Sequence, residues 1–505
     1  MSLNYNFIWL LCYLLVLVGL AGYGFHRLSI VYLYWKNRNN KPQPKARFQE
    51  LPVVTVQLPM FNEKFVVDRL LESVAALDYP QDKLEIQILD DSTDDTTEQC
   101  YRKVEELKSR GFDAVCIHRT DRIGFKAGAL EAATKVAKGE FLLILDADFV
   151  PEPDLLQKTI HFFTDENVGL VQTRWGHINR EYNLLTRIQG MYLDGHFAME
   201  QTARNRSGRF FTFNGTAGIW RKCVIGDAGG WSHDTLTEDM DLSYRVQLRG
   251  WRFIYLNDVV TPAELPVDMD GFKSQQHRWT KGSIQVCQKI LLDIWRSNAP
   301  LKAKVEATTH LTCNYSYLLL ALLCFLVYPI CTQRIPENET VFMWFVNVAL
   351  FFMTSVAVCI FYMSAQIVVR PKSWWKELPY LPLLLTLSVG MAVNNAKAVL
   401  EAIFGHQSAF VRTPKYGVDR KEDRRHVSQL KRNGYRAIKS VVIPVLEIAC
   451  GTFFLNLIII MIRQGHYLSP ILMIPFLGFY YTGFCSLGRM ISNLLPAKQT
   501  AKAKN

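Results

Sequence analysis

Two aspartates that directly follow an apolar stretch are the first residues of this chain whose types and spacing could carry chemistry. The stretch "FLLILDAD" (141–148) ends in Asp146 and Asp148, which brings two hard oxygen ligands close together. Mg²⁺ or Mn²⁺ held by one or two carboxylates, with substrate phosphates completing the shell, is the usual use of such a pair. The alternative is a pair of turn-forming or helix-capping aspartates. The position directly after a buried strand favours the metal.

Two further acidic clusters could serve the same site. Asp90 and Asp91 end the run "EIQILDD", where they can cap the next helix or contact a nucleoside. The cluster "TEDMDLSYR" (237–245) contains Asp239 and Asp241, which cannot share a helix face because they are two residues apart. One of them can therefore point into a site while the other packs elsewhere. A carboxylate near a sugar hydroxyl is a natural general base, and the alternative is an acidic first turn of a helix.

Two loops rich in small residues could contact a ligand. "DRIGFKAGAL" (121–130) has two glycines around Lys126, and a flexible loop with a lysine can approach a diphosphate. The chain has no Walker lysine motif and no GxGxxG, which argues against an ATP P-loop or a dinucleotide site. "FFTFNGTAG" (210–218) mixes aromatic residues with Asn, Gly and Thr. It suits a sugar-binding surface or, alternatively, a buried strand and turn.

The stretch "SQQHRWTKG" (274–282) is predicted to be helical. Gln275, Arg278 and Trp279 then share one face, since residues three and four apart line up on a helix. That face offers an amide, a guanidinium that can bind phosphate with two parallel bonds, and a flat π surface on which a sugar ring can stack. The alternative is a tryptophan packed on the domain and an arginine in a surface ion pair.

An α/β sheet is expected to position these residues. Short apolar runs bounded by turn or charged residues predict strands, and the stretches between them predict helices, which indicates a parallel sheet with helices on both faces. The predicted strands are 53–58, 85–91, 114–119 and 141–148, and the predicted helices include 63–77 and 94–110. Ligands of such sheets bind beyond the carboxyl ends of the strands, where Asp90-Asp91 and Asp146-x-Asp148 stand.

Composition and charge narrow the class of protein. The chain has 505 residues, 49% of them hydrophobic, and a formal charge of +11. Its lysines and arginines cluster beside apolar segments, at 36–47, 370–376 and 420–439, which fits loops that face anionic lipid rather than nucleic acid. The 11 cysteines are irregularly spaced without a CxxC, so we expect neither a disulfide framework nor a zinc site. Those outside the apolar segments suit a reducing compartment.

Apolar segments on both flanks predict an integral membrane protein. Residues 6–26 are long and almost uncharged, without the basic region and small-residue cleavage site of a signal peptide, so we expect a spanning helix. Positive charges follow it, which predicts that residues 36–300 lie in the cytoplasm. Further candidates are 311–331, 342–368, 378–396, 441–462 and 469–489. The basic segments on both sides of 378–403 predict that this one is re-entrant or interfacial, which leaves five crossings.

The order of these motifs is more specific than any one of them. DD, DxD, TED and Gln-x-x-Arg-Trp, followed by membrane helices, resemble the processive family-two glycosyltransferases, which include cellulose, chitin and hyaluronan synthases. The flanking residues are similar to the cellulose-synthase-like A and C branches, the mannan and xyloglucan-backbone synthases. The matching stretches are "GFKAGAL", "LVQTRW" (170–175), "FNGTAG", "EDMDLSYR" and "QQHRW". The resemblance covers residues 50–285 strongly and the membrane half more loosely.

The resemblance implies an α/β GT-A fold, a Rossmann-like mixed sheet, in a cytosolic domain inserted between transmembrane α-helices. The implied parts are a transmembrane helix at 1–35, the glycosyltransferase domain with interfacial helices at 45–300, transmembrane and re-entrant segments at 301–403, a cytosolic gating loop at 404–440, transmembrane helices at 441–490 and a basic tail at 491–505. The implied location is a bacterial inner, plasma or Golgi-type membrane with the catalytic domain in the cytosol.

The resemblance also implies a role for each motif residue. The catalytic pair is Asp239, as base, and Glu238; the metal ligands for Mg²⁺ or Mn²⁺ are Asp146 and Asp148; the donor-binding residues are Asp90, Asp91, Lys126, Asp146, Gln275, Arg278, Thr413 and Lys415; the acceptor-binding residues are Trp279, Asn214, Gly215 and Thr216. The stretch "FVRTPK" (410–415) resembles the gating loop F-x-V-T-x-K, with Arg412 in place of the valine and Pro414 before Lys415.

The implied reaction is the inverting transfer of a hexose from UDP-glucose or GDP-mannose to a growing β-glycan, which the helices then translocate. The partners would be the nucleotide sugar, the glycan and the bilayer, without nucleic acid; oligomeric state and accessory subunits stay open. One alternative is a membrane transferase that adds a single sugar to a lipid. Another is a sugar-binding or transport protein with a decayed transferase domain, against which the intact acidic set argues.

Overall fold

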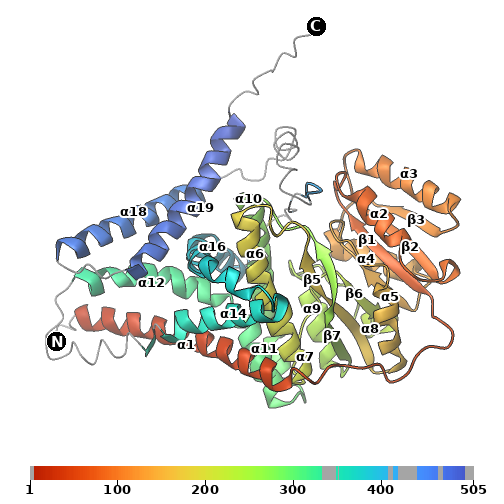
Figure 1. Ribbon diagram of the computed structural model, residues 1–505, viewed down its shortest axis with the longest axis horizontal. Helices are drawn as coiled ribbons and strands as arrows, with labels where there is room; N and C mark the ends of the chain where they lie inside the picture. The colour runs from red at the N-terminus through yellow and green to blue at the C-terminus, as the bar shows by residue number, and fades with distance from the viewer. Residues whose placement is uncertain are drawn as a thin grey trace, which may run out of the picture.

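The structure is a computed structural model that describes residues 5–332, 349–350, 352–407, 413, 415–418, 441–464 and 470–494. Figure 1 shows two parts side by side, with long helices on one side and a sheet covered by helices on the other. Helices α6 (Leu184–Asp194) and α10 (Met269–Arg296) lie between the two parts. These two helices therefore connect the sheet to the membrane-type helices.

The sheet has seven strands in the order β3-β2-β1-β4-β6-β5-β7. The strands are β1 (Val54–Met60), β2 (Leu84–Asp90), β3 (Asp113–His118), β4 (Phe141–Ile144), β5 (Val168–His177), β6 (Gly218–Arg221) and β7 (Arg252–Ala263). Neighbouring strands are parallel except that β6 runs antiparallel to both β4 and β5. The four predicted strands correspond to β1 to β4, so a mixed sheet replaces the wholly parallel one that the apolar runs alone indicated.

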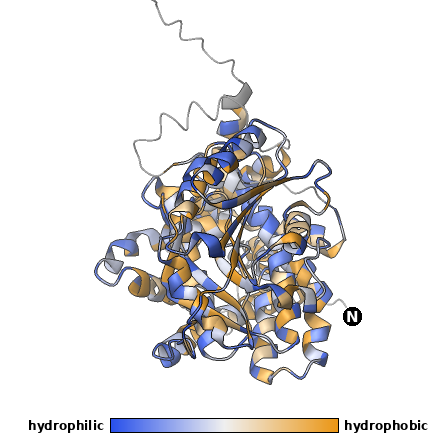
Figure 2. Ribbon diagram, turned by 90° about the vertical axis from the view of Figure 1, so that its right-hand side faces the viewer, coloured by the Kyte–Doolittle hydropathy of each residue, from blue (hydrophilic) through white to orange (hydrophobic). Residues whose placement is uncertain are grey.

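Both faces of the sheet are buried because alternate residues of each strand point to opposite sides. One core joins Val54, Val56 and Leu58 of β1 to helices α2 (Val67–Ala75) and α3 (Thr96–Ser109). The other core packs β4 and β6 against helices α4 (Phe125–Val136), α8 (Lys222–Asp227) and α9 (Glu238–Leu248). In Figure 2 the strands are largely orange, the colour of hydrophobic residues. The helices around them carry blue, hydrophilic residues as well. Because helices cover both faces of the sheet, a ligand can approach the parallel strands at their carboxyl ends.

The helical part contains segments that are long and apolar enough for a membrane. Its elements are α1 (Tyr5–Asn37), α11 (Leu301–Thr312), α12 (Tyr315–Thr332), η4 (Phe352–Val356), α14 (Ala357–Val369), η5 (Trp374–Tyr380), α15 (Leu381–Gly390), α16 (Ala392–Ile403), α18 (Val442–Arg463) and α19 (Pro470–Leu494). Within the described residues, Ile8–Asn37 and Val442–Arg463 each qualify as a span. Apolar side chains on these two helices are exposed, such as Phe25 (63% exposed) and Val442 (61%), as expected for side chains that contact lipid.

Bent helix pairs bear on the predicted number of crossings. The pair Leu301–Thr312 and Tyr315–Pro329 bends by 52°, and the pair Trp374–Gly390 and Ala392–Ile403 bends by 41°. Counting each pair as one span raises the described total from two to as many as four. A bend of this kind occurs in a broken span as well as in a re-entrant loop, so the re-entrant segment and the five crossings stay predictions. Part of the segment predicted at 342–368 lies outside the described residues.

Candidate active site

A cavity opens at the carboxyl ends of the parallel strands and collects most of the predicted residues. Except for Asp90 and Thr216, all of them line it: Asp91, Lys126, Asp146, Asp148, Asn214, Gly215, Glu238, Asp239, Gln275, Arg278, Trp279, Thr413 and Lys415. The residues come from the sheet edge, from α9, from α10 and from the segment around residue 415. Their roles stay predictions, while their common cavity is a property of the fold.

The paired aspartates follow strand β4 and each has a lysine partner. Lys126 Nζ donates to Asp146 Oδ1, and Lys415 Nζ donates to Asp148 Oδ2 at 2.6 Å. The Asp146 main-chain N–H donates to Thr216 Oγ1 at 2.8 Å, so Thr216, which is fully buried, supports the turn rather than facing the cavity. The two carboxylates and their lysine partners lie together in one corner of the cavity. The carboxylates could bind a metal ion there, and the lysines could bind a diphosphate.

The carboxylate of Asp239 lies at the first turn of α9, opposite the paired aspartates. It accepts a hydrogen bond from the Met240 N–H at 2.8 Å. Burial and the neighbouring charge of Glu238 raise the pKa of Asp239 to about 7, although Lys126 and Arg278 act in the other direction. A carboxylate with a pKa near neutrality is suited to accept a proton at physiological pH.

Asp241 follows on the same helix but faces away from this cavity. Its Oδ2 accepts from Arg245 Nε at 2.8 Å, and its Oδ1 lies 2.9 Å from Lys289 Nζ. The side chain is fully buried. This is the division of tasks expected for two residues that are two positions apart in a helix.

Helix α10 presents Gln275, Arg278 and Trp279 to the cavity along one face. Its N-terminus is capped by Asp268, whose Oδ1 accepts from the Gly271 N–H at 2.9 Å. On other faces, Lys273 Nζ donates to Glu447 Oε2 of α18 at 2.6 Å, which ties α10 to a membrane-type helix. The motif residues therefore lie where the α/β domain meets the helical part.

The two aspartates predicted for the nucleoside differ in position. Asp91 lines the cavity and receives both Nε (2.9 Å) and Nη2 (2.6 Å) of Arg119. Asp90 is fully buried, and its carboxylate accepts from Thr97 Oγ1 and pairs with His118 Nδ1, both at 2.7 Å. The predicted contact of Asp90 with the donor stays a prediction; in the structure its carboxylate links β3, through His118, to the start of α3, through Thr97. Asp90 also accepts from the Ser92 N–H at 3.1 Å, so it holds the turn before α3, whose N-cap residue is Asp95.

The "FNGTAG" loop divides between core and cavity. Phe211 is buried in the core, whereas Phe213, although also buried, lines a second cavity next to the first. Asn214 and Gly215 line the cavity, and Lys126 Nζ donates to the Gly215 carbonyl at 2.9 Å. Gly215 has φ +83°, and a Cβ there would lie 3.1 Å from Asp239 Oδ2. Glycine is therefore needed both for the turn and for the close approach to Asp239.

A second cavity adjoins the first on the side of the membrane-type helices. The two share walls that include Trp175, Asn214, Asp239 and Trp279. The second cavity continues to Arg27 of α1, to residues of α14 and to the π-helical segment η3 (Gly195–Gln201). A path of polar and aromatic side chains thus runs from Asp239 toward the helical part.

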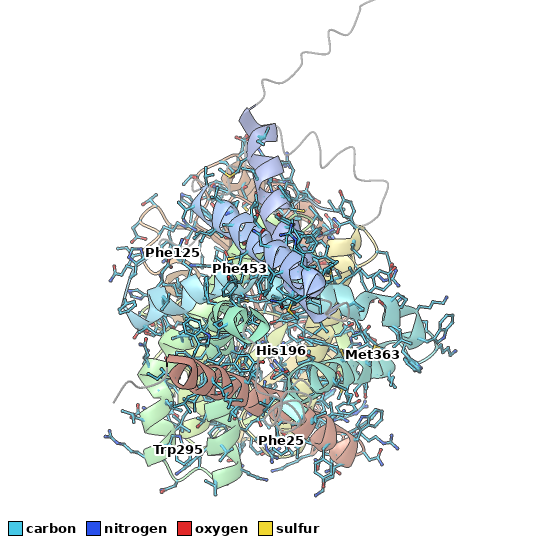
Figure 3. The ribbon with its side chains drawn as sticks, turned by 90° about the vertical axis from the view of Figure 1, so that its left-hand side faces the viewer. Phe25, Phe125, His196, Trp295, Met363 and Phe453 are labelled. Atoms are coloured by element: carbon cyan, nitrogen blue, oxygen red, sulfur yellow. The ribbon has the colours of Figure 1, made fainter. Side chains whose placement is uncertain are left out.

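The segment η3 holds Asn214 in place at this junction. His196 Nε2 lies 2.9 Å from Asn214 Nδ2, and Gln201 Nε2 donates to Asn214 Oδ1 at 2.6 Å. Burial and nearby arginines lower the pKa of His196 to about 3, so its neutral ring can accept the amide proton. His196 Nδ1 in turn pairs with Glu200 at 3.0 Å, and Glu200 meets Arg27. Figure 3 labels His196 near the middle of the molecule, behind the long helices.

Sequence reasoning missed several residues that line one or the other of the two cavities. Trp175, which stacks on Phe197 with a centroid distance of 4.6 Å, stood in a stretch matched as a whole, without a role of its own. Glu264 carried no signal, since it follows β7, a strand that the apolar pattern did not predict. His196 belongs to a π-helical turn, a feature that often marks functional sites but has no sequence pattern.

Two protein-family models match this chain. Residues 52–282 match a family model described as glycosyltransferase like family 2, and residues 218–464 match one described as cellulose synthase. Together the two matches run from the first strand to the end of α18. They confirm the resemblance that the order of motifs indicated.

Two curated relatives and one solved structure are similar to this chain. "Glucomannan 4-beta-mannosyltransferase 2" of Arabidopsis thaliana is 42% identical over 286 residues, 54% of this chain and 53% of the relative. "Glucomannan 4-beta-mannosyltransferase 1" of Oryza sativa subsp. japonica is 40% identical over 277 residues, again 54% and 53%. The chain spans about half the length of the curated relatives it matches.

The solved structure is the mannosyltransferase PcManGT from Pyrobaculum calidifontis in complex with GDP-Man and Mn²⁺. It has a TM-score of 0.56 and 20% identity, and the match covers 78% of this chain and 100% of that chain. At this identity the likeness establishes the fold, and it confirms the mixed α/β GT-A sheet. The chain is therefore similar to the family 2 glycosyltransferases over residues 52–282 and to the cellulose synthases over residues 218–464.

Proposed function

We propose that this chain transfers a hexose from a nucleotide sugar to a growing β-glycan. The observation that carries the proposal is the single cavity that brings together the paired aspartates, a base, a guanidinium and an indole: Asp146, Asp148, Asp239, Arg278 and Trp279. Each group matches one requirement of glycosyl transfer, and all five face the same space. A protein that only binds sugar would not need a carboxylate whose pKa is raised to about 7 in the same cavity as the paired aspartates.

The chemistry is one displacement at the anomeric carbon. The acceptor hydroxyl oxygen attacks this carbon, Asp239 accepts the hydroxyl proton, and the bond to the nucleoside diphosphate breaks. Arg278 donates hydrogen bonds to the departing diphosphate, and Trp279 stacks on the acceptor sugar. A single displacement inverts the anomeric configuration, so an α-linked donor yields a β-linkage.

The paired aspartates fit a divalent cation. Both carboxylates line the cavity, and two carboxylates with phosphate oxygens and water form the shell that Mg²⁺ or Mn²⁺ takes. Lys126 and Lys415 already bind these oxygens, which indicates a corner that accepts positive charge. A bound cation would supply charge stabilisation for the diphosphate.

The acceptor is a sugar chain rather than a lipid. The second cavity, which begins at Asp239, is lined by Arg27, His196 and Glu200 as well as by aromatic residues. Hydroxyl groups can form further hydrogen bonds with such side chains, whereas covering them with an acyl chain would remove them from water at a cost in free energy. The same path leads toward the membrane-type helices, which supports release of the polymer through them.

The basic segments beside the apolar helices support a cytosolic position for the catalytic domain. The donor is GDP-mannose or UDP-glucose. The names of the two curated relatives, both mannosyltransferases, favour GDP-mannose.

Purified full-length protein tests the proposal. It is incubated with Mg²⁺ or Mn²⁺, an oligosaccharide acceptor and a panel of nucleotide sugars, and the product is sized and digested with linkage-specific enzymes. We expect a β-linked polymer from one of the two named donors. Transfer of one sugar to a lipid would support the alternative transferase, and absence of turnover with every donor would reject the proposal.

A further inference from the structure

Glu264, the residue directly after β7, uses its main chain to join two parts of the cavity. Its main-chain N–H donates to Asp148 Oδ2 at 3.2 Å, and its carbonyl accepts from Lys415 Nζ at 2.7 Å. Lys415 Nζ also donates to the same Asp148 oxygen at 2.6 Å. One residue of the sheet edge therefore touches both a proposed metal ligand and a lysine far along the chain.

The side chain of Glu264 holds three consecutive main-chain amides. Its Oε1 accepts from the Tyr416 N–H at 2.9 Å, and its Oε2 accepts from the N–H groups of Gly417 at 3.0 Å and Val418 at 3.2 Å. Glu264 is only 3% exposed. A buried carboxylate is costly unless its oxygens are bonded, and hydrogen bonds to a charged acceptor are stronger than neutral ones. The carboxylate and segment 415–418 therefore stabilise each other.

Packing and backbone geometry also hold segment 415–418 in this position, which we call the dock of the segment. Tyr416 and Val418 are buried in a small apolar cluster with Tyr182 and Val267. Gly417 has φ +67°, and a Cβ there would lie 2.8 Å from the Phe65 carbonyl oxygen. Only glycine allows the segment to bend this close to the neighbouring chain.

We propose that Glu264 is a positioning residue, whose carboxylate docks segment 415–418 so that Lys415 reaches Asp148 and the diphosphate of the donor. Both of its carboxylate oxygens accept main-chain hydrogen bonds, so we assign Glu264 to positioning rather than to the role of base or metal ligand. The inference rests on the proposed transferase function for its kinetic consequence. Its structural part, the dock, stands independently of turnover.

Hydrogen exchange tests the dock directly on the full-length protein in lipid nanodiscs, without donor. Glu264→Gln keeps the shape but replaces one acceptor oxygen by an amide that cannot accept. We expect the amides of residues 416–418 to exchange at least tenfold faster than in the wild type. Glu377→Gln is the matched control, since Glu377 is equally buried and pairs with Arg187 and Arg370 outside the cavity. Unchanged exchange in Glu264→Gln would overturn the proposal.

Steady-state kinetics test the consequence for the donor. Glu264→Gln should raise the KM for the nucleotide sugar by about tenfold to a hundredfold, the factor that one lost hydrogen bond to a charged group represents. The acceptor KM should stay within about twofold, and Glu377→Gln should change neither constant. Lys415→Gln should add little to Glu264→Gln, because both changes act through the same contact.

A second variant separates positioning from folding. Glu264→Asp keeps the charge but withdraws it by one methylene, so we expect a donor KM and an exchange rate between those of the wild type and Glu264→Gln. Additive effects of Glu264→Gln and Lys415→Gln, or a donor KM equal to that of Glu377→Gln, would refute the positioning role. Absence of turnover in the wild type would reject the proposed function and leave the exchange result to decide on the dock.

Discussion

Replacing Asp239 by asparagine separates the catalytic role of this residue from its effect on stability. Asparagine has nearly the same shape but cannot take up a proton from the acceptor hydroxyl. Loss of a general base typically lowers the rate by about 10²- to 10⁴-fold. We therefore expect kcat to fall by this factor, while the KM for the donor changes little.

The same substitution should make the protein more stable. The pKa of Asp239 rises from 3.8 to about 7, and a shift of about three units corresponds to roughly 4 kcal/mol at full strength. The side chain is still partly open to the cavity, where water screens its charge. We therefore expect a gain of about 2 kcal/mol in the free energy of unfolding at alkaline pH.

The sign of the pH dependence follows from the direction of this shift. The folded carboxyl keeps its proton to a higher pH than the unfolded one, so the wild type loses stability as pH rises from about 4 to about 7. Asparagine has no proton to lose. The advantage of Asp239→Asn should therefore be small at pH 4.5 and should level off above pH 7.

Two measurements on the purified protein check this reasoning. Transfer from labelled donor to acceptor gives kcat and both KM values, and denaturant unfolding in nanodiscs at pH 4.5 and pH 8 gives the stability difference. Asp241→Asn serves as the control, because Asp241 pairs with Arg245 away from the active-site cavity. It should destabilise the protein. Turnover of Asp239→Asn at the wild-type rate would refute the catalytic assignment, and an equal stability gain at both pH values would refute the electrostatic cause.

The activity of the wild type should rise with pH around 7 as Asp239 ionises, which a pH profile of kcat/KM would show; a flat profile from pH 5 to pH 9 would contradict it. Arg278→Ala should lower kcat and weaken donor diphosphate binding, whereas Trp279→Ala should raise mainly the acceptor KM; equal effects on both would count against this division. Asp148→Ala should abolish Mn²⁺ binding in the presence of nucleoside diphosphate, as measured by electron paramagnetic resonance, and retained affinity would exclude this carboxylate as a ligand. Gly215→Ala should reduce both stability and kcat, because Cβ would meet Asp239 Oδ2 at 3.1 Å and the φ of +83° is strained; wild-type values would show that the turn adapts.

Local sequence patterns were enough to predict the site residues that lie at strand ends and on one face of a helix. A parallel strand sends its last residues to the carboxyl edge, so the run before Asp146 and Asp148 already placed both at the site. The spacing in "QQHRW" likewise put Gln275, Arg278 and Trp279 on one helix face, because the period of 3.6 residues leaves no other arrangement. The order of the motifs determined the family, which the family models confirm.

Tertiary structure alone decided which groups face the cavity and which support it. Asp90 and Asp91 are adjacent and of the same type, yet one is buried under His118 while the other lines the cavity. The Glu264 carboxylate has its main-chain partners only because residues 415–418 return to it from far along the chain. Periodicity describes neighbours within one element, whereas burial and long-range hydrogen bonds depend on how elements pack. For this reason the sequence could indicate the reacting groups, but not the residues that hold them in place.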